Sequence, residues 1–189
     1  MTSVELLLRE LVELSHQQKN PRLAAIADAL TSESVVSSEA MAAVGAVEIE
    51  RKYLLSGLPP EVLGFRGTRL AQGYLPGERL VERVRQKGEG TDARYIRTVK
   101  LGEGVARIEI EEECDRSVFE VLWSLTQGQR IEKVRYKVPM DELFWEVDNF
   151  SERDLVLAEI ELPSTDYAVT IPDWLAPWMV REVTGERAF

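Results

Sequence analysis

Charged side chains recur at a spacing of two residues along most of the chain. Acidic pairs include Glu48 with Glu50 and Glu109 with Glu111, and a basic pair is Arg83 with Arg85. The same spacing relates Glu50 to Lys52, Lys133 to Arg135, Glu146 to Asp148, and Glu159 to Glu161. Carboxylates without histidine or thiolate neighbours are hard oxygen ligands that suit Mg2+ or Mn2+. Arginine forks and lysines bind anions with many oxygens, so a linear polyphosphate bridging metal and bases would satisfy both groups.

The residues between these charges decide whether the charges share one interior. In LVLAEIELP the intervening residues Ala158, Ile160 and Leu162 are apolar, and alternate residues of a strand face opposite sides of the sheet. Alternating charge usually marks the solvated face of an antiparallel sheet, which is the alternative for any single pair. Recurrence on several strands instead favours inverted strands, whose charged sides face one shared interior. Because each uncompensated buried ion costs several kcal/mol, such an interior must contain water and a ligand.

Turn signals divide the chain after Gly45 into segments with a strand pattern. We expect strands at Val47 to Leu55, Arg69 to Leu75, Arg79 to Gln86, Ala93 to Leu101, Ala106 to Glu112, Glu132 to Val138, Glu142 to Asn149 and Val156 to Leu162. A helix is expected between Asp115 and Leu125. The side chains of Tyr74, Trp123 and Trp145 are expected to pack between helix and barrel. The fold class is therefore α+β: an eight-stranded antiparallel barrel with flanking helices and an N-terminal helical arm.

The first 45 residues have a different pattern, and we predict an N-terminal helical extension over 1–45 and a barrel domain over 46–189. Apolar residues follow helical spacing at Val4, Leu7, Leu8, Leu11 and Leu14, and Asn20 with Pro21 interrupts that pattern. A second helix is expected over 21–30. The arm is interpreted as a helical pair packed on the body, with a homodimer or partner surface as the alternative.

Composition limits the classes of partner. A net charge of −10 and a pI near 4.8 argue against nucleic acid, which needs a broad basic surface. No apolar run is long enough to cross a membrane, so no membrane partner is expected. The single cysteine, Cys114, excludes an internal disulfide and a cysteine-rich zinc site, which fits a cytoplasmic protein. His16 is the only histidine and lies in the arm, so a histidine-activated nucleophile is not expected.

An ordered set of motifs carries a family resemblance. The motifs are EIERK at Glu48, QGYL at Gln72, RVR at Arg83, TVK at Thr98, the acidic run from Glu109 to Glu111, EKVRY at Glu132, WEVD at Trp145, LAEIEL at Leu157 and EVTG at Glu182. In this order they resemble the triphosphate tunnel metalloenzymes, also called the CYTH superfamily, and in particular the short bacterial inorganic tripolyphosphatases. The resemblance implies an eight-stranded tunnel that binds a triphosphate along its axis with a divalent metal ion, Mg2+ or Mn2+.

The resemblance also implies roles for the charged residues. Metal binding falls to Glu48, Glu50, Asp148, Glu159 and Glu161, assisted by Glu109 and Glu111. Phosphate binding falls to Lys52, Arg83, Arg85, Lys100, Lys133 and Arg135, with Lys52, Lys100 and Glu50 as the candidate catalytic residues. The expected reaction is metal-assisted hydrolysis of a terminal phosphoryl group. The alternatives are a thiamine triphosphatase, a nucleoside triphosphatase, a class IV-type adenylyl cyclase, or a polyphosphate- or nucleotide-binding module without catalysis.

Overall fold

The computed structural model describes residues 47–77, 81–101 and 105–186. The predicted arm lies outside these residues, so its helices and the domain boundary at residue 45 stay predictions. Within the described residues, no helix combines the length and the apolar character that crossing a membrane requires.

The described chain is built mainly of strands. The strands are β1 (Val47–Leu55), β2 (Gly67–Tyr74), β3 (Val81–Lys87), β4 (Arg94–Leu101), β5 (Ala106–Glu113), β6 (Arg130–Met140), β7 (Leu143–Phe150), β8 (Val156–Glu161) and β9 (Met179–Glu182). The helices are α4 (Arg116–Ser124) and three short 3-10 helices: η1 (Pro60–Gly64), η2 (Gly90–Asp92) and η3 (Ala176–Trp178). The eight predicted strands and the predicted helix are confirmed. The ninth strand, β9, was not predicted.

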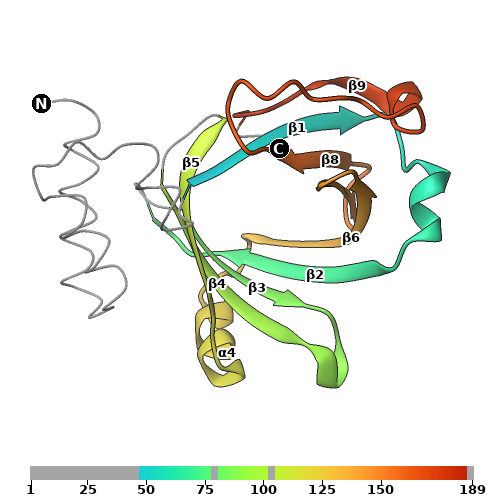
Figure 1. Ribbon diagram of the computed structural model, residues 1–189. Coiled ribbons are helices and arrows are strands. Elements are labelled where there is room, and N and C mark those ends of the chain that lie inside the picture. Colours follow the sequence, from blue (N-terminus) through green and yellow to red (C-terminus); the bar gives the residue numbers. More distant parts are fainter. Residues whose placement is uncertain (1–46, 78–80, 102–104, 187–189) are drawn as a thin grey trace, which may run out of the picture. The chain divides into compact units, whose positions relative to one another are not determined.

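The strands form one antiparallel sheet in the order β5-β4-β3-β2-β6-β7-β8-β1-β9, and β5 also pairs with β1. This last pairing closes the sheet on itself, and Figure 1 shows the strands arranged as a ring. At the closure, the backbone N–H of Glu50 donates to the carbonyl of Val105 at 3.1 Å. Closure removes the sheet edges that would otherwise stay unpaired along β1 and β5. The predicted tunnel architecture is confirmed.

The main apolar core lies on the outer side of the ring. Tyr53 of β1, Trp145 of β7 and Ile160 of β8 are buried there, with η1 contributing Val62 and the chain after β8 contributing Leu175. Burial of each such large side chain contributes about 1.5–3 kcal/mol to folding. Because the apolar side chains point outward into this covered core, the opposite face of the same strands is left for polar groups.

Helix α4 covers a second part of the outer face, over β3 and β4. The ring of Phe119 lies 4.8 Å from that of Tyr95 on β4, and Trp123 stacks on Phe119 at 5.2 Å between centroids. Trp123 therefore packs with the helix as predicted. Trp145 lies in the other core, where its ring is 5.6 Å from that of Tyr53 and the short helix η1 contributes Val62.

Candidate active site

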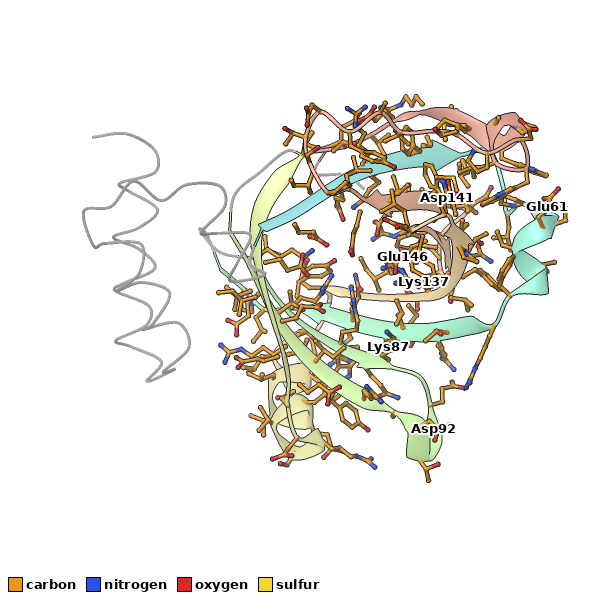
Figure 2. The ribbon with its side chains drawn as sticks, viewed as in Figure 1. Glu61, Lys87, Asp92, Lys137, Asp141 and Glu146 are labelled. Atoms are coloured by element: carbon orange, nitrogen blue, oxygen red, sulfur yellow. The ribbon has the colours of Figure 1, made fainter. Side chains whose placement is uncertain are left out.

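Strand register assigns the charged side chains to one face. Residues directly opposite each other in neighbouring strands lie on the same face of a sheet. Tyr74, Arg83, Thr98 and Glu111 form one such row across β2, β3, β4 and β5. A second row runs across β6, β7, β8 and β1 through Lys137, Glu146, Glu159 and Lys52. Lys137 and Glu146 point inside the ring, whereas Glu61 and Asp92 lie at its periphery (Figure 2).

The first group of facing charges comes from β3, β4, β5 and the start of β1. Arg83 is buried, and its Nη2 donates to Thr98 Oγ1 at 3.0 Å, Glu111 Oε1 at 3.0 Å and Glu109 Oε1 at 3.2 Å. Lys100 forms ion pairs with Glu109 and, at 3.5 Å, with Glu48 Oε2. Within the described residues the buried Nε of Arg83 has no hydrogen-bond partner.

Glu48 and Glu109 form a carboxyl pair within this group. Burial, helped by the hydrogen bond with Glu109, raises the pKa of Glu48 to about 8 against the opposing charge of Lys100. Burial also acts to raise the pKa of Glu109, but its hydrogen bond with Glu48 and the charge of Lys100 lower it to about 2. The proton of the pair therefore resides on Glu48. Two carboxyl groups in such contact need either a shared proton or a cation between them.

The second group comes from β6, β7, β8 and the middle of β1. Asp148 is fully buried and accepts hydrogen bonds from Lys133 Nζ at 2.5 Å and from Arg135 at 2.5 and 2.7 Å. Arg135 also donates to Glu146 and, at 2.7 Å, to Glu159 Oε2. Lys52 Nζ lies 3.0 Å from Glu159 Oε1. These acids and bases satisfy each other without a ligand.

Opposite charges dominate the electrostatics of this second group. Burial acts to lower the pKa of Arg135, but Asp148 and Glu159 raise it well above the ordinary value. Burial acts to raise the pKa of Glu159, but Arg135, Lys52 and Lys133 lower it well below the usual range. For Lys133, burial outweighs the attraction of Asp148, and its pKa is lowered.

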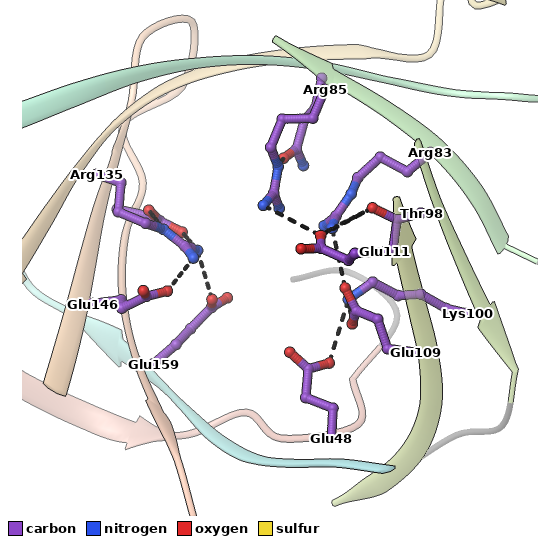
Figure 3. Close-up of polar contacts among 12 residues, drawn as sticks. Glu48, Arg83, Arg85, Thr98, Lys100, Glu109, Glu111, Arg135, Glu146 and Glu159 are labelled. Atoms are coloured by element: carbon purple, nitrogen blue, oxygen red, sulfur yellow. Dashed lines mark hydrogen bonds and ion pairs between the residues drawn. The ribbon is translucent and has the colours of Figure 1, made fainter. Parts of the chain in front are cut away.

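Arg85 has a different environment. Its Nε donates to Gln72 Oε1 at 3.3 Å, and Glu111 is an ion-pair partner at 3.8 Å. Burial and the charges of Arg83 and Arg135 lower the pKa of Arg85 to about 10. Figure 3 shows its guanidinium pointing into the space between the two groups. The positive charges of Arg83 on β3 and Arg135 on β6 therefore repel the charge of Arg85, and the attraction of Glu111 does not fully offset this repulsion and the effect of burial.

The remaining predicted acids lie near the second group. Glu50 is 5% exposed, lies opposite Glu161 in the β1–β8 ladder and has Lys52 Nζ at 3.6 Å. Glu161 ends β8 and is exposed as a residue, but partial desolvation of its carboxyl, together with the charges of Glu146 and Glu50, raises its pKa. Glu50 and Glu161 are therefore on the same face, as their spacing predicted.

The acids on the inner face are of the type that binds a divalent metal ion. Carboxylate oxygens are the ligands that Mg2+ and Mn2+ prefer, and the Glu48–Glu109 contact is the kind of pair that a cation stabilises. The residues thus fit a hard divalent ion in type. The seven predicted ligands are divided between the two groups, and in the described part of the chain no three acidic, histidine or cysteine side chains form a ready metal cluster.

Four inner-face residues were missed as site residues by sequence analysis: Gln72, Tyr74, Thr98 and Lys137. Tyr74 was expected to pack against a helix, but it lies opposite Arg83, and its hydroxyl accepts a hydrogen bond from Gln72 Nε2 at 2.8 Å. Lys137 lies 3.2 Å from Glu146. All four share the inner face with predicted residues on their strands or on the next strand, so register could have identified them. Gln72, Tyr74 and Thr98 are neutral, so they do not belong to the runs of charge at a spacing of two.

Comparisons with known proteins agree with this geometry. No protein-family profile matches the chain. The chain is 39% identical over 149 residues to an inorganic triphosphatase of Nitrosomonas europaea, covering 75% of this chain and 92% of the relative. It is 34% identical to an inorganic triphosphatase of Acetivibrio thermocellus over 142 residues, covering 74% of this chain and 86% of that relative.

A solved structure is also similar. The crystal structure of the inorganic triphosphatase NE1496 matches with a TM-score of 0.52 and 33% identity, covering 75% of this chain and 89% of that one. A closed antiparallel sheet with facing acids and bases on its inner side is what the resemblance to the tunnel enzymes implied. The chain belongs to the triphosphate tunnel metalloenzymes, and within them to the inorganic triphosphatase family.

Proposed function

We propose that this protein hydrolyses inorganic tripolyphosphate to pyrophosphate and orthophosphate inside the ring of strands, with Mg2+ or Mn2+. The observation that carries the proposal is the region around Arg85, where burial and the positive charges of Arg83 and Arg135 lower the pKa of this guanidinium. A bound polyanion would neutralise this charge. The two relatives named inorganic triphosphatase support the choice of substrate.

In this proposal the bases hold the phosphate chain. Arg83 and Arg85 approach it from β3, and Lys133 and Arg135 approach it from β6. Arginine forks supply paired donors to phosphate oxygens, whereas lysines act as point charges. Lys52 and Lys100 stand on β1 and β4 and extend the positive charge to both groups. At an effective dielectric of about 20, one such contact at about 4 Å contributes roughly 4 kcal/mol before desolvation.

The acids take the metal in the proposal. Triphosphatases of this kind depend on a metal ion, and Glu48, Glu50, Glu109, Glu111, Asp148, Glu159 and Glu161 are the proposed ligands. A divalent ion, when bound, acts as a Lewis acid that polarises phosphoryl oxygens and activates water. Glu50 is buried beside Lys52, so we assign it to orient the attacking water and accept its hydrogen bond.

The reaction transfers one phosphoryl group. The oxygen of water attacks the terminal phosphorus, the bridging P–O bond breaks, and pyrophosphate leaves with the bond's electron pair. The proton that the water loses passes to Glu50, which accepts its hydrogen bond, and from there to solvent. Lys52 and Lys100 lie in the two different groups of charges, so we assign them to stabilise charge that develops on the terminal and bridging oxygens. No covalent intermediate with the protein is needed.

The proposal explains why acids and bases are interleaved. Without ligands, Arg83 bonds to Glu109 and Glu111, and Lys52 pairs with Glu159. Substrate and metal would exchange these contacts, with phosphate taking the bases and metal taking the acids. Each exchange replaces a charge contact with another, which limits the desolvation cost of binding.

A panel of substrates with a metal titration tests the proposal. Tripolyphosphate, thiamine triphosphate and ATP are compared at equal concentration by phosphate release, with Mg2+ or Mn2+ increased from zero. We expect the highest kcat/KM with tripolyphosphate and no release with a chelator. Preference for thiamine triphosphate or ATP would assign the site to that substrate instead, and cyclic AMP as product would indicate a cyclase. Binding without phosphate release at every metal concentration would identify a binding module.

A further inference from the structure

The EVTG motif at Glu182–Gly185 has no charged side chain in the two groups described above, yet it contacts the backbone of Lys52. The N–H of Val183 donates to the carbonyl of Lys52 at 2.8 Å. The N–H of Lys52 donates to the side-chain Oγ1 of Thr184 at 3.0 Å. Both backbone groups of Lys52 are therefore bonded to this motif.

These two bonds bridge an interruption along one edge of β1. On that edge the N–H of Glu50 bonds to Val105 next to β5, and Leu54 lies opposite Arg181 of β9. Lys52 lies between these two points, beyond the end of each partner strand. The Thr184 hydroxyl takes the place of the backbone carbonyl that a continuing strand would supply.

The hydroxyl of Thr184 is itself oriented. It donates its proton to Glu182 Oε1 at 2.8 Å, and a hydroxyl has only one proton to donate. Its lone pairs are therefore directed to the N–H of Lys52. Glu182 lies 3.7 Å from Arg51, the neighbour of Lys52 on β1. The arrangement fixes both the hydroxyl and the strand that it holds.

The opposite edge of β1 at this point is held by β8, where Lys52 lies opposite Glu159. Lys52 is bonded to the motif on one edge, and its neighbours Arg51 and Tyr53 lie in the ladder with β8 on the other edge. The Cα of Lys52 therefore has little freedom to move, and its Nζ lies 3.0 Å from Glu159 Oε1. We propose that Thr184 is a positioning residue that fixes the backbone of Lys52, and through it the ammonium group that contacts the phosphate chain. This inference rests on the proposed function, since Lys52 is assigned there to bind phosphate.

Removal of the hydroxyl tests the inference. Thr184→Val keeps the branched shape but can neither accept from Lys52 nor donate to Glu182, whereas Thr184→Ser keeps both bonds. We expect Thr184→Val to lower kcat/KM for tripolyphosphate by about tenfold to a hundredfold, mainly through kcat, because small misplacement of a reacting group is costly. Thr184→Ser should stay within about threefold of wild type by the same argument. Thr184→Ala serves as a second variant if the valine does not fold.

Two further readouts separate positioning from a general structural role. In a Lys52→Ala background, Thr184→Val should cost little more, because residues acting through one another are not additive. The amide of Lys52 should also exchange hydrogen faster in Thr184→Val than in Thr184→Ser. Thr91→Val, on exposed η2, is the matched control and should match wild type in all three measurements.

The outcomes are distinct. An undiminished loss in the Lys52→Ala background, or unchanged kcat/KM in a folded Thr184→Val protein, would overturn the positioning role. An inactive wild type would instead overturn the proposed function, and the exchange rate of the Lys52 amide would still decide whether Thr184 holds this strand.

Discussion

The ammonium of Lys133 and the carboxylate of Asp148 meet on the inner face of the ring at 2.5 Å, and Asp148 has no exposed surface. The two residues come from neighbouring strands, β6 and β7, and Arg135 bonds to the same carboxylate. A carboxylate this deeply buried persists only because two cations surround it. The inner face is thus a connected set of charges rather than isolated surface pairs.

Asp148→Asn should strongly destabilise the protein. The amide keeps the shape of the side chain but removes the charge that compensates Lys133 and Arg135. Because breaking a buried ion pair on one side leaves an uncompensated charge, we expect the free energy of unfolding to fall by about 3–5 kcal/mol. Urea denaturation measures this, with exposed Asp173→Asn as the control. A difference below about 1 kcal/mol, the range of exposed pairs, would show that Asp148 is not part of a buried network.

Arg85→Met should weaken ligand binding without weakening the fold. The charge of Arg85 is poorly compensated, so its loss should leave the free energy of unfolding unchanged or raise it. Tripolyphosphate affinity, measured by calorimetry with a chelator present, should fall about tenfold or more, because a hydrogen bond to a charged group contributes about 1.5–3 kcal/mol.

Arg135→Met is the contrasting variant for Arg85. Its guanidinium bonds to Asp148, Glu146 and Glu159, so its removal should lower both affinity and the free energy of unfolding, the latter by about 3 kcal/mol or more. Equal stability losses in the two variants would contradict the assignment of Arg85 as the under-compensated base.

Thr98→Val tests whether Thr98 orients Arg83. The hydroxyl accepts from Arg83 Nη2 and donates to Glu111 Oε1, each at 3.0 Å, and Thr98 is fully buried. Valine has the same branched shape, so the strand should persist with a stability loss of about 1–3 kcal/mol from the unpaired groups. We expect kcat/KM for tripolyphosphate to fall about tenfold through loss of orientation, with exposed Thr170→Val unchanged. Wild-type kinetics in folded Thr98→Val would refute this role.

Gly73→Ala should destabilise the contact between β2 and the chain after α4. A Cβ at Gly73 would lie 2.4 Å from Thr126 Oγ1, and Thr126 is buried and bonded to Trp123 and Arg130. Overpacking of this kind typically costs 1–3 kcal/mol, so we expect about that loss in a denaturation experiment. Gly64→Ala meets no atom within 4 Å and is the control. Equal stability of the two variants would mean that β2 and Thr126 do not approach closely.

The alternation of side chains along a strand explains why the sequence could predict which charged residues share a face. A period of two placed Glu48, Glu50 and Lys52 on one face of β1, and it placed Arg83 and Arg85 together on β3. The inverted pattern was readable because apolar residues such as Ile160 stood between the charges. The structure places these apolar residues in a covered outer core, which the sequence could indicate only by their alternation.

Long-range pairing accounts for what the sequence did not predict. The division of the acids into two groups depends on which strands are neighbours, and β2 pairs with β6 rather than with β1. Strand β9 has only four residues, too few for a periodic signal, and its pairing depends on β1. The contact between Thr184 and Lys52 joins residues 132 positions apart, so no local pattern could reveal it.

The measurement that tests the central claim most directly is phosphate release from tripolyphosphate by inner-face variants and matched outer variants. Glu50→Gln and Lys100→Ala remove charges from the inner face, while Glu120→Gln and Arg116→Ala remove the same kinds of charge from exposed positions on α4. With Mg2+ or Mn2+ present, we predict that the inner-face variants lose about a hundredfold or more in kcat/KM, as removal of one stabilising group typically does, while both α4 variants match wild type. Full activity in folded Glu50→Gln and Lys100→Ala proteins would contradict the account.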